Sequence, residues 1–325
     1  MKAAVVEQPG GPEVLQIKEI PVPPPKPGWV LIRVKAFGLN RSEMYTRQGH
    51  SPGVRFPRVL GIECVGVVED GGGTDLEPGQ KVAAVMGEMG RAYNGGYAEY
   101  TLVPRSQVMA LTTDLPWEML AAIPETYLTA WGSLVEALDV QRGHKLLIRG
   151  GTSALGMAAI SLAKDMGLYV TATTRNTGKA AALLANGADD VIMDTGQIAQ
   201  TARERIPDGF DCTLELIGTA TLLDSLHTVR TRGIVCMSGL LGNEWALREF
   251  EPLAQMPSTV RLTIYTSETV TATTGTAALQ RIVEGVETGR YRPNMHKVFH
   301  LEEIAAAHRY MEENHSTGKL VVVTE

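Results

Sequence analysis

A glycine-rich turn between an apolar strand and an alanine-rich helix carries the clearest chemical signal in the sequence. Residues 145–164 read KLLIRGGTSALGMAAISLAK. This pattern predicts a buried strand at 145–149, a tight turn at 150–156 and a helix at 157–164. The N-terminus of such a helix binds anions through its free N–H groups, and glycines let a pyrophosphate approach the backbone. The stretch therefore indicates a dinucleotide-binding site.

The spacing within the turn supports this interpretation, with one departure. Gly151-x-Ser153-x-x-Gly156 has serine where the usual G-x-G-x-x-G motif has its middle glycine. Many glycine-rich turns only connect elements, but serine is small enough to leave room for a pyrophosphate. The residues expected to contact the cofactor here are Gly151, Thr152, Ser153, Ala154, Leu155 and Gly156.

The end of the next expected strand indicates which dinucleotide binds. Residues 169–175 read YVTATTR, without an acidic side chain. An Asp or Glu at this point would hold the 2′-hydroxyl of NAD, whereas Thr174, Arg175 and the nearby Lys179 suit the 2′-phosphate of NADP. The alternative is that Arg175 and Lys179 only solvate the start of a helix. We predict NADPH rather than NADH as the cofactor.

Composition limits the class of protein. The 325 residues are enough for two domains, and with a formal net charge of −6 and scattered basic residues no nucleic-acid partner is expected. No apolar stretch approaches the length of a membrane span, and no signal segment precedes the first strand-like pattern. The three cysteines are isolated and the seven histidines lack a metal-binding spacing. We therefore expect a cytoplasmic protein without a membrane or metal partner.

The first 120 residues predict a compact, barrel-like β domain, because short strands alternate there with Gly and Pro turns. Polar side chains gather between two of these strands, on a loop and short helix that contain Asn40, Glu43, Tyr45 and Arg47. The expected strands are 3–6, 15–19, 30–36, 65–69, 82–85 and one within 96–104.

Residues 121–266 predict a doubly wound parallel sheet, because strands and helices alternate regularly. In such a sheet the ligand crevice lies beyond the carboxyl ends of the strands, so 150–156, 173–175, 216–218 and 238–242 should converge on the cofactor. This adds Ile217 and Ser238 to the site. After the opening strand and helix, the expected order is strand 169–173, helix 179–185, strand 191–193, helix 198–206, strand 210–215, helix 220–231, strand 233–238 and strand 260–266.

Residues 267–325 are expected to return to the first domain, because the nucleotide sheet is already complete at residue 266. The expected elements are helix 275–288, strand 296–300, helix 302–314 and strand 319–322. The predicted domains are thus 1–120, a catalytic domain; 121–266, the dinucleotide-binding domain; and 267–325, the return to the catalytic domain.

In combination, several motifs make the chain resemble the zinc-free quinone oxidoreductase branch of the medium-chain dehydrogenase/reductase superfamily, over essentially its whole length. They are KAAV at 2–5, the polar segment 38–49, LGIE at 60–63, PGQKV at 78–82, GYAEY at 96–100, Thr129-Ala130, the turn 150–156 and GKL at 318–320. The resemblance implies a GroES-like β-barrel catalytic domain joined to a Rossmann domain.

The resemblance also implies an activity. Zinc-containing relatives have a cysteine where this chain has Asn40 and a histidine where it has Ile62. Without a Lewis acid, the branch reduces quinones or α,β-unsaturated carbonyls with NADPH, because these conjugated acceptors take hydride at carbon. Relatives dimerise by continuing the nucleotide sheet, and the strand at 260–266 is a plausible edge for a homodimer.

Individual roles follow from the same resemblance. Thr129 would contact the nicotinamide carboxamide, and Gly239 and Leu240 would border the nicotinamide ring. Asn40 would hydrogen-bond the nicotinamide or the substrate. Tyr45 and Arg47 would stabilise the oxyanion that develops as hydride arrives.

Three of the polar residues have alternatives. For Arg47, the two predictions are that it stabilises the oxyanion or that it pairs with Glu43 one helical turn earlier. Lys319 reaches the cofactor phosphate or only terminates a strand. Glu63 touches substrate or holds a loop together.

Two departures from relatives shape the prediction. Related enoyl reductases use a tyrosine where this chain has His50-Ser51, which disfavours an enoyl-thioester substrate unless His50 acts as the acid. Many quinone reductases place a tyrosine after the third nucleotide-domain strand for the adenosine phosphate, where this chain has Met193-Asp194. Arg175 would then carry more of the NADP preference.

The alternative function is an NADPH-binding protein with a structural or regulatory role and little turnover.

Overall fold

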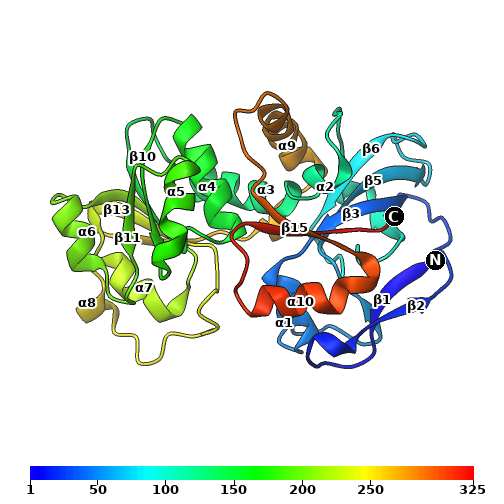
Figure 1. The fold of residues 1–325 in the computed structure, drawn as a ribbon, viewed down its shortest axis with the longest axis horizontal. Coiled ribbons are helices and arrows are strands. Elements are labelled where there is room, and N and C mark those ends of the chain that lie inside the picture. Colours follow the sequence, from blue (N-terminus) through cyan, green and yellow to red (C-terminus); the bar gives the residue numbers. More distant parts are fainter. The chain divides into compact units, whose positions relative to one another are not determined.

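The computed structural model describes residues 1–325, which form two compact units (Figure 1). The first unit comprises Met1–Leu128, Ser267–Gly289 and Pro293–Glu325, and the second comprises Thr129–Thr266 with Arg290–Arg292. The chain first passes from one unit to the other within helix α3 (Pro124–Gly132), which is later than the predicted boundary at residue 120. Elements from both ends of the chain, blue to cyan and orange to red in Figure 1, thus belong to one unit.

The first unit is built mainly from antiparallel strands. One sheet has the order β2-β1-β4, and the other has the order β15-β16-β3-β5-β6-β8, with β7 also paired to β3. Strands β4 and β8 were not expected from the sequence, because two or three residues show no periodicity. The strands are β1 (Lys2–Val6), β2 (Leu15–Glu19), β3 (Trp29–Gly38), β4 (Arg58–Val59), β5 (Glu63–Asp70), β6 (Lys81–Val85), β7 (Tyr100–Pro104), β8 (Val108–Ala110), β15 (Met295–His300) and β16 (Lys319–Val323).

The longest helix of this unit begins earlier than its apolar pattern suggests. Thr271 accepts a hydrogen bond from the Thr274 backbone N–H and starts α9 at Ala272. Its buried face, which includes Leu279 and Ile282, packs on β8. The other helices are α1 (Arg41–Arg47), α2 (Trp117–Leu120) and α10 (Ile304–Glu312), with α9 spanning Ala272–Glu287 and 3₁₀ turns at η1 (Pro12–Val14), η2 (Arg105–Gln107), η5 (Ser267–Thr269) and η6 (Leu301–Glu303).

The second unit contains a six-stranded parallel sheet with the order β11-β10-β9-β12-β13-β14. The chain builds outward from β9 to β11 and then restarts beside β9 with β12. This reversal is the switch point at which doubly wound sheets bind ligands. The predicted α/β fold class is confirmed. The strands are β9 (Lys145–Arg149), β10 (Tyr169–Thr174), β11 (Asp190–Met193), β12 (Phe210–Glu215), β13 (Val229–Met237) and β14 (Arg261–Ile264).

One predicted helix in this unit is too long. The expected helix at 220–231 is α7, which ends at Leu226, and β13 begins at Val229. Val229 pairs with Phe210 of β12, so pairing in the sheet overrides the helical pattern. The remaining helices are α4 (Ala154–Asp165), α5 (Ala180–Ala185), α6 (Ala199–Arg205) and α8 (Pro252–Gln255), with short turns at η3 (Ser133–Ala137, π-helical) and η4 (Thr177–Lys179).

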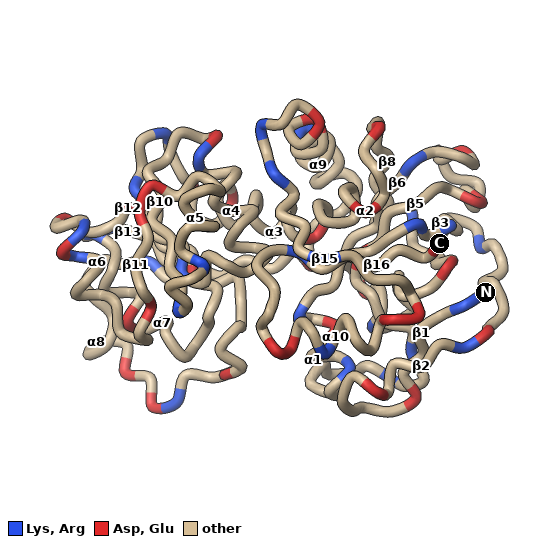
Figure 2. The backbone as a smooth tube through the Cα atoms, viewed as in Figure 1, with Lys and Arg blue, Asp and Glu red and all other residues tan.

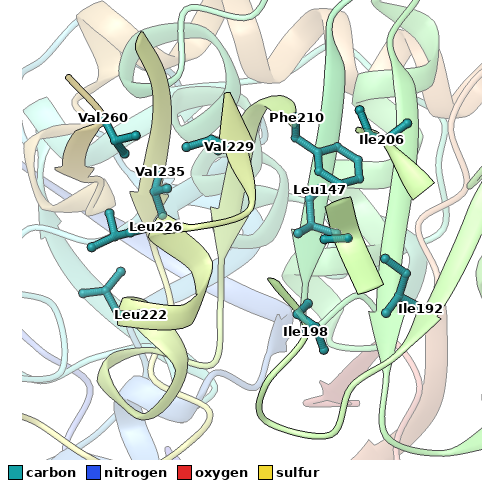
Figure 3. Packing of buried hydrophobic residues seen from close by; sticks show 11 residues of the cluster. Leu147, Ile192, Ile198, Ile206, Phe210, Leu222, Leu226, Val229, Val235 and Val260 are labelled. Carbon is teal, nitrogen blue, oxygen red and sulfur yellow. The ribbon is translucent and has the colours of Figure 1, made fainter. Parts of the chain in front are cut away.

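A compact apolar core holds this sheet to two of its helices (Figure 3). Leu147 of β9 and Phe210 of β12 pack with Ile206 beside α6 and with Leu222 and Leu226 of α7. Burial of each such side chain contributes about 1.5–3 kcal/mol. The core therefore fixes α7 and the segment beside α6 against the sheet.

Charge is distributed without a single-sign block. Acidic and basic residues are interspersed along the backbone of both units in Figure 2. None of the helices combines the length and the apolar character needed to cross a membrane.

Candidate cofactor and active site

The glycine-rich turn leads from β9 into α4, which begins at Ala154. The Ser153 hydroxyl accepts a hydrogen bond from Gly156 N (3.0 Å) and donates one to Gly150 O (2.9 Å). Serine at the middle motif position is therefore the N-cap of the helix. The N–H groups of Ala154 and Leu155 lie in the first helical turn, where no intrahelical acceptor exists. They remain for an anionic ligand.

Two glycines of this turn are required by close packing. A Cβ atom on Gly156 would lie 2.6 Å from Gly150 O, and one on Gly151 would lie 2.9 Å from the Cβ of Ala172. The first contact brings α4 close to the turn, and the second brings the turn close to β10. The turn thus has the shape of a cradle in which side chains are excluded and N–H groups are exposed, which fits a pyrophosphate.

The residues expected to select the 2′-phosphate differ in their surroundings. Thr174 is buried, and its hydroxyl accepts a hydrogen bond from Asn176 N (3.1 Å). Arg175 is exposed and forms no ion pair. Partial burial lowers the pKa of Lys179. Arg175 is therefore an exposed cation at this strand end, with Lys179 partly buried nearby.

Asp194, which follows the third strand, points inward rather than toward a ligand. Its carboxylate accepts from Arg149 through Nε (2.9 Å) and Nη2 (3.1 Å), and the Asp194 side chain is 5% exposed. Its carboxylate is thus bound to Arg149 inside the unit.

The loops after β12 and β13 are tied to each other. The N–H groups of Ile217 and Gly218 both donate to Glu215 Oε1, at 2.7 and 3.1 Å. A Cβ on Gly239 would lie 2.5 Å from Leu216 O, so the two loops meet without an intervening side chain. Leu240 follows Gly239 in this contact region.

A second link joins Thr129 to Ser238. Ser133 Oγ donates to Thr129 O (2.7 Å) and lies 2.8 Å from Ser238 Oγ. Because the single hydroxyl hydrogen of Ser133 serves Thr129, Ser238 must donate to Ser133. The structure thus connects two residues that the sequence assigned separately to the cofactor.

In the first unit, Asn40 belongs to a buried polar cluster with Glu43, Glu63 and Lys319. Asn40 Oδ1 accepts from Lys319 Nζ (2.6 Å), and Asn40 Nδ2 donates to Glu63 Oε1 (2.9 Å) and Glu43 Oε1 (3.3 Å). Both amide hydrogens of Asn40 are therefore occupied. Asn40 is also the N-cap of α1, and its side chain faces the Glu43 backbone N–H in a capping box.

Lys319 and Glu63 form the charged centre of this cluster. Lys319 Nζ lies 2.7 Å from Glu63 Oε1, and each side chain is 1% exposed. Glu63 Oε2 also accepts from Glu125 N at 2.9 Å, so it binds the first turn of α3. A Cβ on Gly38 would lie 2.2 Å from Lys319 Cε, so glycine is required beside the pair. Contact between Lys319 and the cofactor stays a prediction.

Glu43 closes the cluster at the start of α1. It accepts from the N–H groups of Asn40 (3.0 Å) and Ile62 (3.2 Å). Burial raises its pKa to about 7, although these hydrogen bonds act in the opposite direction. The site therefore holds a carboxyl group that titrates near neutrality.

This titration predicts a pH-dependent stability. Glu43 has a higher pKa folded than its ordinary 4.5, so its contribution is complete below pH 4.5 and is lost as the pH rises to 7. We expect the wild type to lose about 3 kcal/mol relative to Glu43→Gln over this range, at 1.36 kcal/mol per pKa unit. Urea unfolding at a series of pH values measures the difference in slope.

The slope is the test for Glu43, because glutamine cannot accept all of the same hydrogen bonds and will shift the absolute stability. Glu77→Gln, at an exposed position in the same unit, is the matched control. Parallel profiles for the wild type and Glu43→Gln would contradict the assignment.

One of the two predictions for Arg47, an ion pair with Glu43, is wrong. Its fully buried guanidinium binds Glu312 Oε1 (2.7 Å), Gly10 O (3.2 Å) and His308 Nδ1 (3.3 Å). Helix α10 supplies the carboxylate and imidazole, and this tertiary contact overrides the helical neighbour. The charge of Arg47 is thus used between α1 and α10.

Tyr45 is largely buried beside Arg41. Burial raises the pKa of its hydroxyl, and the nearby Arg41 acts in the opposite direction. The structure therefore separates Tyr45 from Arg47, although both lie on α1. The predicted contact of Tyr45 with substrate stays a prediction, and the burial of Arg47 against α10 disfavours a direct contact for that residue.

The side chains present do not form a metal site. No group of three or more His, Cys, Asp or Glu is arranged to hold an ion. Cys64, Cys212 and Cys236 are each buried and free.

Sequence reasoning missed Arg149, His308 and Glu312. A signal existed for Arg149, because a charge at the end of the apolar run KLLIR is unusual in a buried strand. No local pattern indicated the partners that α10 provides.

Comparison with known proteins agrees with this architecture. Two family descriptions match: "Alcohol dehydrogenase GroES-like domain" at residues 26–113 and "Zinc-binding dehydrogenase" at residues 186–322. A quinone oxidoreductase of Pongo abelii is 30% identical, with 99% of this chain and 98% of that protein covered. A 2-haloacrylate reductase of a Burkholderia species is 29% identical, with 99% of each covered.

Solved structures give the same result. A quinone oxidoreductase of Pseudomonas syringae has a TM-score of 0.90 at 25% identity and 99% coverage of both chains. A mycobacterial protein solved with NADPH has a TM-score of 0.89 at 26% identity and full coverage of both. The chain belongs to the quinone oxidoreductase branch of the medium-chain dehydrogenase/reductase superfamily and is an oxidoreductase.

Proposed function

We propose that the protein is an NADPH-dependent, zinc-independent reductase that transfers hydride to a quinone or an α,β-unsaturated carbonyl. The observation that carries this proposal is the tight glycine turn at 150–156, which leads into the N-terminus of α4 and is followed along the chain by a strand end with exposed Arg175 and no outward acid. The names of the relatives, quinone oxidoreductase and 2-haloacrylate reductase, and the NADPH in a similar structure support it.

NADPH, when bound, supplies the hydride. The backbone of 151–156 would hold its pyrophosphate, Thr129 its carboxamide, and Ile217, Ser238, Gly239 and Leu240 would border the nicotinamide. Thr174, Arg175 and Lys179 would surround the 2′-phosphate. These roles follow from the predicted crevice at the carboxyl ends of the strands.

The acceptor class follows from the donor groups of the first unit. A quinone or enone takes hydride at carbon while negative charge develops on oxygen, which a hydrogen-bond donor stabilises until a proton arrives. We assign that donation to Tyr45. Asn40 would border the nicotinamide rather than hold the substrate, because its amide N–H groups are occupied and its Oδ1 can only accept, as a quinone or enone oxygen does. Arg47 acts indirectly, since its guanidinium is committed to α10.

Two further assignments accompany this proposal. A homodimer would continue the nucleotide sheet at its edge strand β14, where Ile264 is 64% exposed. A cytoplasmic location stays a prediction.

Loss of reduced-nicotinamide absorbance tests the proposed activity, with NADPH and NADH in parallel against quinones, enals and enones. Turnover that favours NADPH supports the reductase. Tight NADPH binding without turnover across the panel would contradict it and favour a binding or regulatory role.

Arg175 provides a test of cofactor choice. We expect Arg175→Ala to raise the Kd for NADPH by about 10- to 100-fold, since a charge-assisted hydrogen bond contributes about 1.5–3 kcal/mol. The Kd for NADH should change by less than about twofold, because it lacks the 2′-phosphate. Fluorescence titration measures both, and Arg281→Ala on exposed α9 surface is the control. Equal losses for the two dinucleotides would refute the assignment.

A further inference from the structure

Arg149 is a fully buried arginine at the end of β9, immediately before the glycine-rich turn. All five of its N–H groups have acceptors. Nε and Nη2 bind the Asp194 carboxylate, and Nη2 also donates to Gly196 O (2.9 Å). Nη1 serves Asp224 Oδ2 (2.8 Å), Ser225 Oγ (3.0 Å) and Thr221 O (3.1 Å). One planar group thus joins residues that follow several different strands.

A chain of hydrogen bonds runs from Arg149 to the turn. Asp194 Oδ2 accepts from Thr173 Oγ1 (3.1 Å), and Thr173 Oγ1 accepts from Gly150 N (3.1 Å). The Thr173 carbonyl accepts from Gly151 N at 3.0 Å. Thr173 therefore holds two consecutive N–H groups at the point where the chain leaves β9. Gly150 O in turn receives Ser153, the N-cap of α4.

A second branch reaches the loop after β12. Ser225 Oγ contacts Arg149 and also donates to Glu215 Oε2. The other oxygen of Glu215 accepts from Ile217 N and Gly218 N. Arg149 is therefore linked, within one unit, to the turn after β9, to the end of β10 and to the loops that follow β11 and β12.

We propose that Arg149 is a positioning residue for the dinucleotide: through Asp194 and Thr173 it fixes the glycine-rich turn, and through Ser225 and Glu215 it fixes the neighbouring loop. The inference rests on the proposed NADPH-binding function. Lysine cannot replace the guanidinium, because a point charge does not hold Asp194 with two parallel hydrogen bonds while also serving Asp224. The guanidinium is the cation paired with both buried carboxylates, Asp194 and Asp224.

The chain offers a matched pair of threonines on β10 to test this role. Thr171 and Thr173 both lie on the same face of the strand and are at most 1% exposed. Thr173 Oγ1 links Asp194 to Gly150, whereas Thr171 Oγ1 has no hydrogen-bond partner. Replacement by valine removes the hydroxyl at nearly constant volume in each case.

We expect Thr173→Val to raise the Kd for NADPH about tenfold, and Thr171→Val to leave it within about twofold, in fluorescence titrations. Binding of adenosine 2′-monophosphate, which lacks the pyrophosphate, should change less than twofold in both. Thr173→Ser should restore NADPH binding. Asp194→Asn is the second variant; it should weaken NADPH in the same selective way, and melting temperatures show that each variant is folded.

Three outcomes would overturn the inference: equal NADPH affinity in the two valine variants, equal losses for NADPH and adenosine 2′-monophosphate in Thr173→Val, or no rescue by serine. Failure of the wild type to bind NADPH would instead overturn the proposed function. The two failures are therefore distinguishable.

Discussion

Replacement of His308 by glutamine is expected to remove about 5 kcal/mol of acid-induced destabilisation between pH 6.5 and 3. His308 is fully buried on α10, and burial, followed by the nearby charge of Arg47, lowers its pKa to about 3. Each pKa unit corresponds to 1.36 kcal/mol. The unfolded chain takes up a proton near pH 6.5 and the folded chain does not, so stability falls as the pH falls through this range.

The hydrogen bonds of His308 explain why glutamine is the right replacement. Arg47 can only donate, so Nδ1 (3.3 Å) must be an acceptor and the neutral ring carries its proton on Nε2, which donates to the Tyr97 hydroxyl (3.1 Å). A glutamine amide also offers one acceptor and a donor group, but it does not titrate. The variant thus preserves the chemistry of the contact and removes the proton linkage.

Urea unfolding from pH 7.5 to 4.5 measures this effect. By pH 4.5 the wild type should have lost about 3 kcal/mol more than His308→Gln, at the same energy per pKa unit. His227→Gln, at an exposed position of the second unit, is the control and should remain within about 0.5 kcal/mol of the wild type. Identical pH profiles for the wild type and His308→Gln would show that the buried imidazole is not held neutral.

Much of the second unit could be predicted from sequence because its signals are local. Strand β9 contains the apolar run Leu146–Ile148, strands and helices alternate regularly after it, and the turn at 150–156 has its own glycine spacing. The end of α7 could not be predicted, because Val229 continues an acceptable helical pattern and only its pairing with Phe210 makes it a strand. Ser153 is a second example. Its small size could be read from the sequence, but its role as N-cap could not be predicted, because that role depends on the residue at which α4 begins.

The polar interior of the first unit was less predictable for a different reason. Arg47 and Glu43 are four residues apart, and a helix places such residues together, so a local pair was a reasonable alternative. The actual partners of Arg47, His308 and Glu312, lie 261 and 265 residues away in sequence. Lys319 and Glu63 are separated by 256 residues. A single sequence gives no indication that positions so far apart will be neighbours in the fold.

Breaking the buried pair between Lys319 and Glu63 should have the other large effect on stability. We expect Lys319→Met to lower the free energy of unfolding by about 3–5 kcal/mol, because it leaves the Glu63 carboxylate buried without its cation. Asn40 would also lose the donor to its Oδ1. The loss should therefore be accompanied by a lower turnover rate in the reductase assay, since the orientation of the Asn40 amide depends on that ammonium.

The double variant Glu63→Gln/Lys319→Met separates charge burial from packing. Without a buried charge it should be more stable than Lys319→Met alone, so the two substitutions will be strongly non-additive in urea unfolding. Lys2→Met is the matched control: Lys2 Nζ lies 2.6 Å from Glu302, but the two side chains are 46% and 54% exposed. Its unfolding midpoint should match the wild type, because solvent already screens that pair. If the double variant were as unstable as the sum of its single variants, the uncompensated carboxylate would not be the cause of the loss.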